Sequence, residues 1–229
     1  MKTKLLSSVL SLFVGITSFA VQPAVHAQTT VKNLETEGVK LGDSVADMEL
    51  ALKKEGWVFW RKTNHKAAAG LPERIATAQY KKDGRNLEPD YMMLVFSPVT
   101  SRVVALSRSE RFNVEITLSD LAKTMSSKYG VPAMTRGATD VSWVEKRAGK
   151  DVTPITQCEA AAGLQLNYAS NLDTFANCRY AVRLAMSPAA KPQLVWRMTL
   201  NMVDFERLYD ETLQLKNALK DQAYIKVGN

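Results

Sequence analysis

Histidine, cysteine and closely spaced carboxylates are the residues of this sequence that could perform chemistry, and few of them are arranged for it. His65 is the only histidine beyond the first 27 residues. A His-x-x-x-His zinc site is therefore ruled out, and a Ser-His-Asp triad would have to use His65. The chain also lacks Gly-x-Ser-x-Gly, Ser-x-x-Lys and Gly-x-Gly-x-x-Gly motifs. We expect His65 to be a solvated loop residue.

Several pairs of carboxylates stand close together in the sequence, such as Glu88 with Asp90 and Asp210 with Glu211. General acid–base catalysis needs a buried carboxyl with a shifted pKa, whereas these pairs lie in polar sequence and are expected to be solvated. Asp140, which precedes a strand-like segment, is the carboxylate whose burial should be checked. The sequence predicts no catalytic residue, no cofactor-binding residue and no metal ligand. A non-enzymatic protein is favoured over an enzyme with an unrecognised carboxylate site.

Cys158 and Cys178 are the only cysteines. In an exported chain two cysteines at this separation predict a disulfide, which would close a loop and contribute about 3 kcal/mol through the unfolded state. A redox pair favours Cys-x-x-Cys spacing, which is absent, and a metal site would need further ligands nearby.

Residues 1–27 have the pattern of a secretory signal peptide. Lys2 and Lys4 form its positive start, an apolar run follows over residues 5–21, and Ala27 precedes the expected cleavage point. The run is short for a membrane span, and no later run reaches that length. We therefore expect an exported protein without a membrane span, most simply in a bacterial periplasm. No cysteine follows the cleavage point, so a lipid anchor is not expected.

The net charge of +7 is spread along the chain, and no run of five basic residues occurs. Nucleic-acid-binding arms show clustered basic residues with interleaved aromatics, so this charge predicts a solvated basic surface and no nucleic-acid partner.

Three segments have the start, apolar stripe and stop of an amphipathic helix. The clearest, residues 117–130, begins with an N-cap threonine that aspartate follows three residues later, and it ends at glycine. Residues 44–56 repeat this order, and Asp204 begins a third helix that should run to about residue 221.

The remaining segments alternate apolar and polar residues, as antiparallel strands with one buried face do. The predicted strands lie at residues 57–62, 74–82, 91–96, 102–112, 141–144, 164–168, 178–186 and 194–203. Since no βαβ order appears, a parallel doubly wound sheet is not expected, and the helices must cover the buried face of the sheet.

An internal duplication is indicated by the order of these elements. A Ser-Pro turn between two strands follows the first helix at Ser97-Pro98 and recurs after the second helix at Ser187-Pro188. The predicted fold class is thus α+β, with two tandem helix-plus-antiparallel-sheet units of about four strands each and a C-terminal helix. The units would span residues 28–113 and 114–229.

The tryptophans Trp57 and Trp60 stand three apart in one predicted strand, so their side chains should face opposite sides of the sheet. We expect one of them to be partly exposed beside Arg61 and Lys62, and exposed tryptophan with arginine is typical of protein-recognition surfaces. The alternative is that a loop or the N-terminus of the chain covers the second ring. Arg179 and Arg183 on a later strand are the candidates for contacting a small ligand or an envelope polymer.

Three features together resemble the β-lactamase-inhibitor-protein-like fold and the related SmpA/OmlA-type units. They are the segment Lys128-Tyr129-Gly130-Val131-Pro132, the tryptophan-bearing strand after it and the Ser-Pro hairpin. The start at Leu41-Gly42-Asp43-Ser44 resembles the same unit. This resemblance implies helices packed on an antiparallel sheet and non-catalytic binding of another protein, here an envelope protein. The alternative is a binder of a glycan, lipid or peptide ligand.

Overall fold

The computed structural model describes residues 31, 34–67, 70–83, 89–150, 153–162, 175–191 and 193–227. The predicted signal peptide, the predicted strand at residues 164–168 and Glu88 lie outside this part of the chain. Within it the fold is α+β with an antiparallel sheet, as the sequence predicts.

The elements follow the order helix, strands, helix, strands, helix after a small N-terminal hairpin. They are β1 Glu35–Thr36, β2 Val39–Lys40, α1 Val45–Lys54, β3 Val58–His65, β4 Arg74–Lys82, β5 Asp90–Phe96, β6 Val103–Thr117, α2 Leu118–Tyr129, β7 Met134–Arg136, β8 Asp140–Lys146, α3 Ile155–Ala162, β9 Cys178–Pro188, β10 Leu194–Asp204 and α5 Phe205–Val227.

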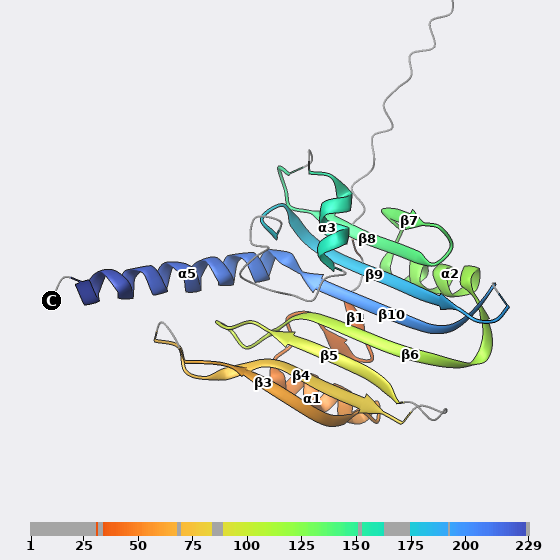
Figure 1. Cartoon of the computed structure of the whole chain (residues 1–229), viewed down its shortest axis with the longest axis horizontal. Coiled ribbons are helices and arrows are strands. Elements are labelled where there is room, and N and C mark those ends of the chain that lie inside the picture. The colour runs from red at the N-terminus through yellow and green to blue at the C-terminus, as the bar shows by residue number, and fades with distance from the viewer. Residues whose placement is uncertain are drawn as a thin grey trace, which may run out of the picture.

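One eight-stranded sheet forms the centre of the molecule, with the strand order β3-β4-β5-β6-β10-β9-β8-β7 (Figure 1). Every neighbouring pair in it is antiparallel. Strands β3 to β6 form one meander and β7 to β10 form another. The two meanders meet where β6 pairs with β10, from Thr117 opposite Leu194 to Ala105 opposite Val203. Hydrogen bonding across the sheet therefore connects the two predicted units directly.

The helix starts are those that the sequence predicts. Ser44 caps α1 and Thr117 caps α2, and each hydroxyl accepts a hydrogen bond from the backbone N–H of the aspartate three residues on. Asp204 caps α5 in the same way, since its carboxylate accepts from the Arg207 N–H at 2.9 Å. Gly130 ends α2 with a φ of 99°, a conformation that side chains with a Cβ rarely adopt.

Four elements were not predicted: the two short strands of the β1–β2 hairpin, β7 and α3. Strand β7 has three residues, too few for an alternating pattern to be recognised. Helix α3 occupies residues 155–162, where the sequence pattern is ambiguous, and its eight residues form less than three turns.

Helices α1 and α2 pack on the same face of the sheet and cover most of its apolar side chains (Figure 1). Alternation along β9 and β10 directs Val182, Leu184 and Leu200 to this helix-covered face. Its buried residues come from both meanders, so one core runs under both helices. The principal members are Met48, Leu52, Met92, Leu94, Leu106, Leu121, Tyr129, Trp143, Leu184, Met198, Leu200 and Met202.

The opposite face of the sheet is covered over one end only. There α3 and the start of α5 bury a second, smaller cluster that includes Val144, Ala181 and Val203 together with Phe205 and Leu208 of α5. Among the residues that the structure describes, no helix lies over the other end of this face, which is called the open sheet face below. One solvated face is an ordinary property of antiparallel sheets.

Two side-chain links fasten the helices of this second cluster. Cys158 of α3 and Cys178 of β9 form the predicted disulfide, with a Cα–Cα distance of 5.7 Å. Glu211 of α5 is buried and accepts hydrogen bonds from the Ser97 hydroxyl and from the Thr100 N–H and hydroxyl, so α5 is tied to the β5–β6 turn. Beyond this point α5 extends away from the sheet (Figure 1). None of the described helices is long and apolar enough to cross a bilayer.

Candidate interaction surface

The open sheet face is built by strand register. Cross-strand pairing aligns Met93 of β5 with Ser107 of β6, and Ser107 in turn with Asn201 of β10, so all three project from the same side of the sheet. The same register extends the face outward to both edges. Its side chains, all half-buried or exposed, are Trp60, Arg61, Gln79, Lys81, Tyr91, Met93, Ser107, Ser109, Arg111, Arg183, Trp196, Arg197, Thr199 and Asn201. Trp60 and Trp196 lie in β-bulges, and we assign them to this face by their contacts with Tyr91 and Arg111.

An aromatic and cationic group lies at the β3 side of this face. The ring of Trp60 packs against Tyr91 with a centroid distance of 5.7 Å, and the Arg61 guanidinium stands 4.4 Å from the Trp60 centroid. The Nε of Arg61 donates to Gln79 at 2.9 Å, which holds its plane over the ring. The Trp60 residue remains 46% exposed. This is an ordered stack of an indole and a cation that is accessible to a partner.

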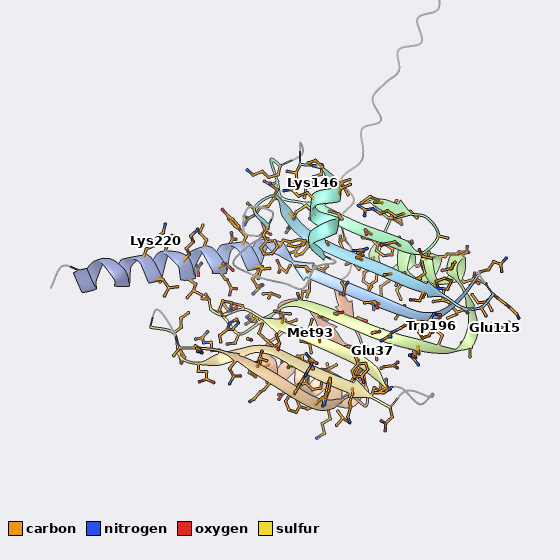
Figure 2. All side chains as sticks on the ribbon, viewed as in Figure 1. Glu37, Met93, Glu115, Lys146, Trp196 and Lys220 are labelled. Carbon is orange, nitrogen blue, oxygen red and sulfur yellow. A yellow bond between two sulfur atoms is a disulfide. The ribbon has the colours of Figure 1, made fainter. Side chains whose placement is uncertain are left out.

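A second group of the same composition lies where the two meanders join. The Arg111 guanidinium stands 4.8 Å from the centroid of Trp196, a residue in the β-bulge of β10 that is 39% exposed. Arg197 on β10 donates from Nε to the Ser109 hydroxyl at 2.8 Å. Figure 2 labels Met93 and Trp196 on the central strands of the sheet.

The two arginines of β9 predicted to contact a ligand are both engaged in ion pairs. Arg183 forms a bidentate ion pair with Asp140 of β8, with its Nη2 at 2.5 Å and its Nε at 3.1 Å from the carboxylate oxygens. Arg179 bridges Glu145 at 2.6 Å and Glu206 at 3.1 Å. Hydrogen bonding to Glu145 raises the pKa of Arg179 further above its ordinary value. Arg183 therefore contributes to the edge of the open sheet face, while Arg179 joins β9 to α5.

Trp57 does not belong to an exposed surface, contrary to its inclusion among the predicted interaction residues. It is 5% exposed and faces the helix-covered side, where its indole N–H donates to Glu37 at 3.3 Å. The β1–β2 hairpin, which carries Glu37 in its turn, covers this tryptophan. The spacing in the sequence places the rings of Trp57 and Trp60 on opposite faces of the sheet. Only the packing of the folded chain decides which of the two rings is covered.

A charged cluster surrounds the same position on the helix-covered face. Glu37 pairs with Arg108 at 2.8 Å and with Lys82 at 3.5 Å, and Arg108 also pairs with Glu110 at 2.5 Å. Burial raises the pKa of Glu110; attraction to Arg108 opposes this rise, and repulsion from Asp90 and Glu37 adds to it. The pocket beside the cluster measures about 290 Å³. Its carboxylates are already paired with cations, so the cluster serves to hold the N-terminal hairpin on the sheet.

The residues considered for catalysis are dispersed. His65 ends β3 rather than lying in a loop, and its Nε2 is 3.2 Å from the Phe96 carbonyl oxygen. Asp140 is half-buried and paired with Arg183, and Asp210 is paired with Arg147 at 2.6 Å. The expectation that Glu211 is solvated is wrong, because the β5–β6 turn covers it and bonds to its carboxylate. Among the residues that the structure describes, no group of three or more His, Cys, Asp or Glu side chains could hold a metal ion.

Sequence reasoning missed Tyr91, Arg111, Trp196 and Arg197 as members of this surface. The available signal was the alternation of β10, which sets Arg197 apart from the apolar Met198 and Leu200 but groups Trp196 with them. The β-bulge between Val195 and Arg197 interrupts this alternation at Trp196, and the sequence does not reveal the bulge. The alternation identifies the wetter side of one strand, but it does not reveal that β6 lies beside it.

No protein-family model matches the chain, and no curated protein or solved structure matches it. The open sheet face and its two tryptophan–arginine groups are therefore the observations on which a function is argued.

Proposed function

We propose that this protein is an exported, non-enzymatic interaction module that binds another envelope protein through its open sheet face. One observation carries the proposal: two exposed tryptophans on this face, Trp60 and Trp196, each lie under an arginine guanidinium. Tryptophan and arginine dominate the binding energy of protein interfaces, and rings held in place lose little entropy on binding.

The charge of the open sheet face defines the partner further. Arg61, Lys81, Arg111 and Arg197 project from it, whereas its Asp140 is already paired with Arg183. The partner should therefore present an acidic surface with apolar side chains that contact the two indoles. An interface of this kind weakens as salt screens its charges.

Export and a tandem architecture belong to the same proposal. The signal-peptide pattern of residues 1–27 and the Cys158–Cys178 disulfide support an oxidising compartment, which we take to be the periplasm. The sheet order supports two tandem units at residues 28–113 and 114–229, because each meander pairs in chain order and the last strands of both meet at the centre. The resemblance to the β-lactamase-inhibitor-protein-like and SmpA/OmlA-type fold group is part of the same proposal and rests on the sequence motifs alone.

The test uses the purified chain as bait for envelope proteins, followed by binding measurements with the captured protein after its purification. We expect Trp60→Ala and Trp196→Ala each to weaken binding at least tenfold, and added salt to weaken it further. Leu50→Ala is the matched control, because Leu50 is 71% exposed on α1, on the helix-covered side of the sheet. Unchanged binding by both tryptophan variants, or an equal loss in the control, would exclude the open sheet face as the binding surface.

A further inference from the structure

A pocket of about 490 Å³ lies on the other side of the sheet, between α2 and the β7–β8 edge. Ten residues from α2, the α2–β7 loop, β7, β8 and the β9–β10 turn line it. They are Thr117, Leu118, Ser119, Ala122, Ser126, Pro132, Thr135, Ala138, Val141 and Gln193. None of these side chains is charged and none is aromatic. The pocket is therefore separate from the open sheet face in both position and chemistry.

The pocket exists because small residues face a short strand. Ser119, Ala122 and Ser126 stand at positions i, i+3 and i+7 of α2, so they form one stripe along the helix beside its large apolar residues. Opposite this stripe the sheet ends at β7, which has three residues. Neither the helix nor the edge strand supplies a side chain large enough to fill the space between them.

The inner wall of the pocket is apolar. Val141 at its base is buried, and the Leu118 and Ala122 side chains are half-buried beside it. Two of the lining hydroxyls are bonded within α2: Thr117 Oγ1 contacts the Asp120 carboxylate at 2.7 Å, and Ser126 donates to the Ala122 carbonyl at 2.8 Å. They offer little to a ligand inside the pocket.

The exposed polar side chains lie at the rim. Ser119, Thr135 and Gln193 are exposed, so they can hydrogen-bond an uncharged polar group at the mouth. None of the lining residues that the structure describes carries a charge that could neutralise a carboxylate or an ammonium group, and burying an unpaired charge is strongly unfavourable. The ligand must therefore enter as an uncharged chain.

We propose that this pocket binds an uncharged aliphatic chain of about ten carbons with a neutral oxygen-bearing end. The lining from Thr117 to Ser126 extends over nine helical residues, a length of about 13 Å. A volume of 490 Å³ corresponds to roughly 16 water-sized groups. An elongated space without aromatic side chains suits a linear chain better than a ring system, and its size is that of small-molecule sites in general. Such a chain comes either as a free alcohol or as a neutral acyl ester of a lipid.

The test is a titration of the full chain, labelled with ¹³C in its alanine, leucine and valine methyl groups, with 1-decanol, methyl decanoate and decanoate. We expect the signals of Leu118, Ala122 and Val141 to shift with saturation for the first two ligands. Decanoate should bind at least tenfold more weakly because its charge has no partner in the pocket. The ratio of the alcohol and ester affinities then distinguishes a free chain from an esterified one.

Ala122→Phe fills the pocket and should weaken decanol binding at least tenfold, while Ala46→Phe, at an exposed position of α1, should leave it unchanged. Ala138→Leu at the mouth is a second blocking variant if Ala122→Phe does not fold. Unchanged decanol binding by a folded blocking variant, or shifts spread evenly over surface methyl groups, would overturn the proposal. So would tighter binding of decanoate or of a leucine-rich peptide than of decanol. None of these outcomes bears on the open sheet face.

Discussion

Trp57 and Trp60 show how position on a strand separates a structural from an interacting role. The first ring is enclosed by the β1–β2 hairpin and bonded to Glu37, while the second stacks between Tyr91 and Arg61 at the surface. Both are large indoles in the same local sequence, so the difference lies entirely in what covers each one.

We expect Trp57→Ala to lower the free energy of unfolding by about 3–5 kcal/mol, because it leaves a cavity in the core and removes the indole hydrogen bond to Glu37. Trp60→Ala should cost about 1 kcal/mol or less, since its ring is half exposed and loses only surface aromatic contacts. Urea unfolding monitored by circular dichroism measures both. Equal destabilisation by the two variants would contradict this assignment of the rings.

The buried carboxyls Glu110 and Glu211 make stability depend on pH. Burial raises the pKa of both, and this outweighs the attraction of Arg108 for Glu110 and the hydrogen bonds of Thr100 to Glu211. A group whose folded-state pKa is raised binds more protons in the folded state. Its contribution to stability is thus fully present below the unfolded pKa of about 4.5 and is lost as pH rises through the folded pKa.

Because protonation of these two carboxyls favours the folded state, we expect the wild type to become more stable as pH falls from 7 to 5. The comparison is with a Glu110→Gln/Glu211→Gln variant. Glutamine stays neutral at every pH and therefore removes the titration. Thermal unfolding midpoints across this range measure the difference, and Glu49→Gln on the exposed side of α1 serves as the control. Parallel pH profiles for wild type and double variant would show that the two carboxyls contribute no such dependence.

At the scale of elements, α3 is the helix most dependent on a covalent link. It is a short helix, and its Cys158 is bonded to the first residue of β9. Isolated helices of this length are unstable in water, so packing against β8 and β9 and the disulfide must hold it.

Replacing both cysteines by alanine should lower the free energy of unfolding by about 3 kcal/mol, because the disulfide closes a loop with a sequence separation of 20 residues. Denaturant unfolding with and without reductant measures this. Reductant should destabilise the wild type by a similar amount and leave the double-alanine variant unchanged. If reductant does not shift the wild-type midpoint, the link does not stabilise the fold.

At the scale of the whole molecule, the two meanders share one sheet and one core. Strand β6 belongs to the first meander and β10 to the second, and each provides the other with its backbone hydrogen-bond partners. The main apolar cluster likewise combines residues of both halves, among them Leu94 of β5 and Leu184 of β9. Separation of the two meanders would expose the long edge of β6 and part of the shared core.

We therefore expect one cooperative unfolding transition. Leu94→Ala and Leu184→Ala, each at a fully buried position, should lower the same midpoint, with a loss of about 2–5 kcal/mol for each variant. Tryptophan fluorescence and far-ultraviolet circular dichroism should give coincident curves. Two separate transitions, with each variant shifting only the one from its own half, would show instead that the halves unfold independently.

Local signals in the sequence determined the α+β class, the capped starts of α1, α2 and α5, most of the strands and the cysteine pair. These features depend on contacts within a helical turn or on alternation along one strand, and both are visible in a short stretch of residues. Cys158 and Cys178 have no competitor as disulfide partners in the chain.

Only the tertiary structure decided which neighbours each strand would have. Arg111 lies over Trp196 because β6 and β10 pair at the centre of the sheet, and Glu211 is buried because α5 begins against the β5–β6 turn. The pocket beside α2 likewise depends on where the sheet ends. Such contacts join residues far apart in the chain, and their free energy depends on the packing of the whole sheet, which no single segment encodes.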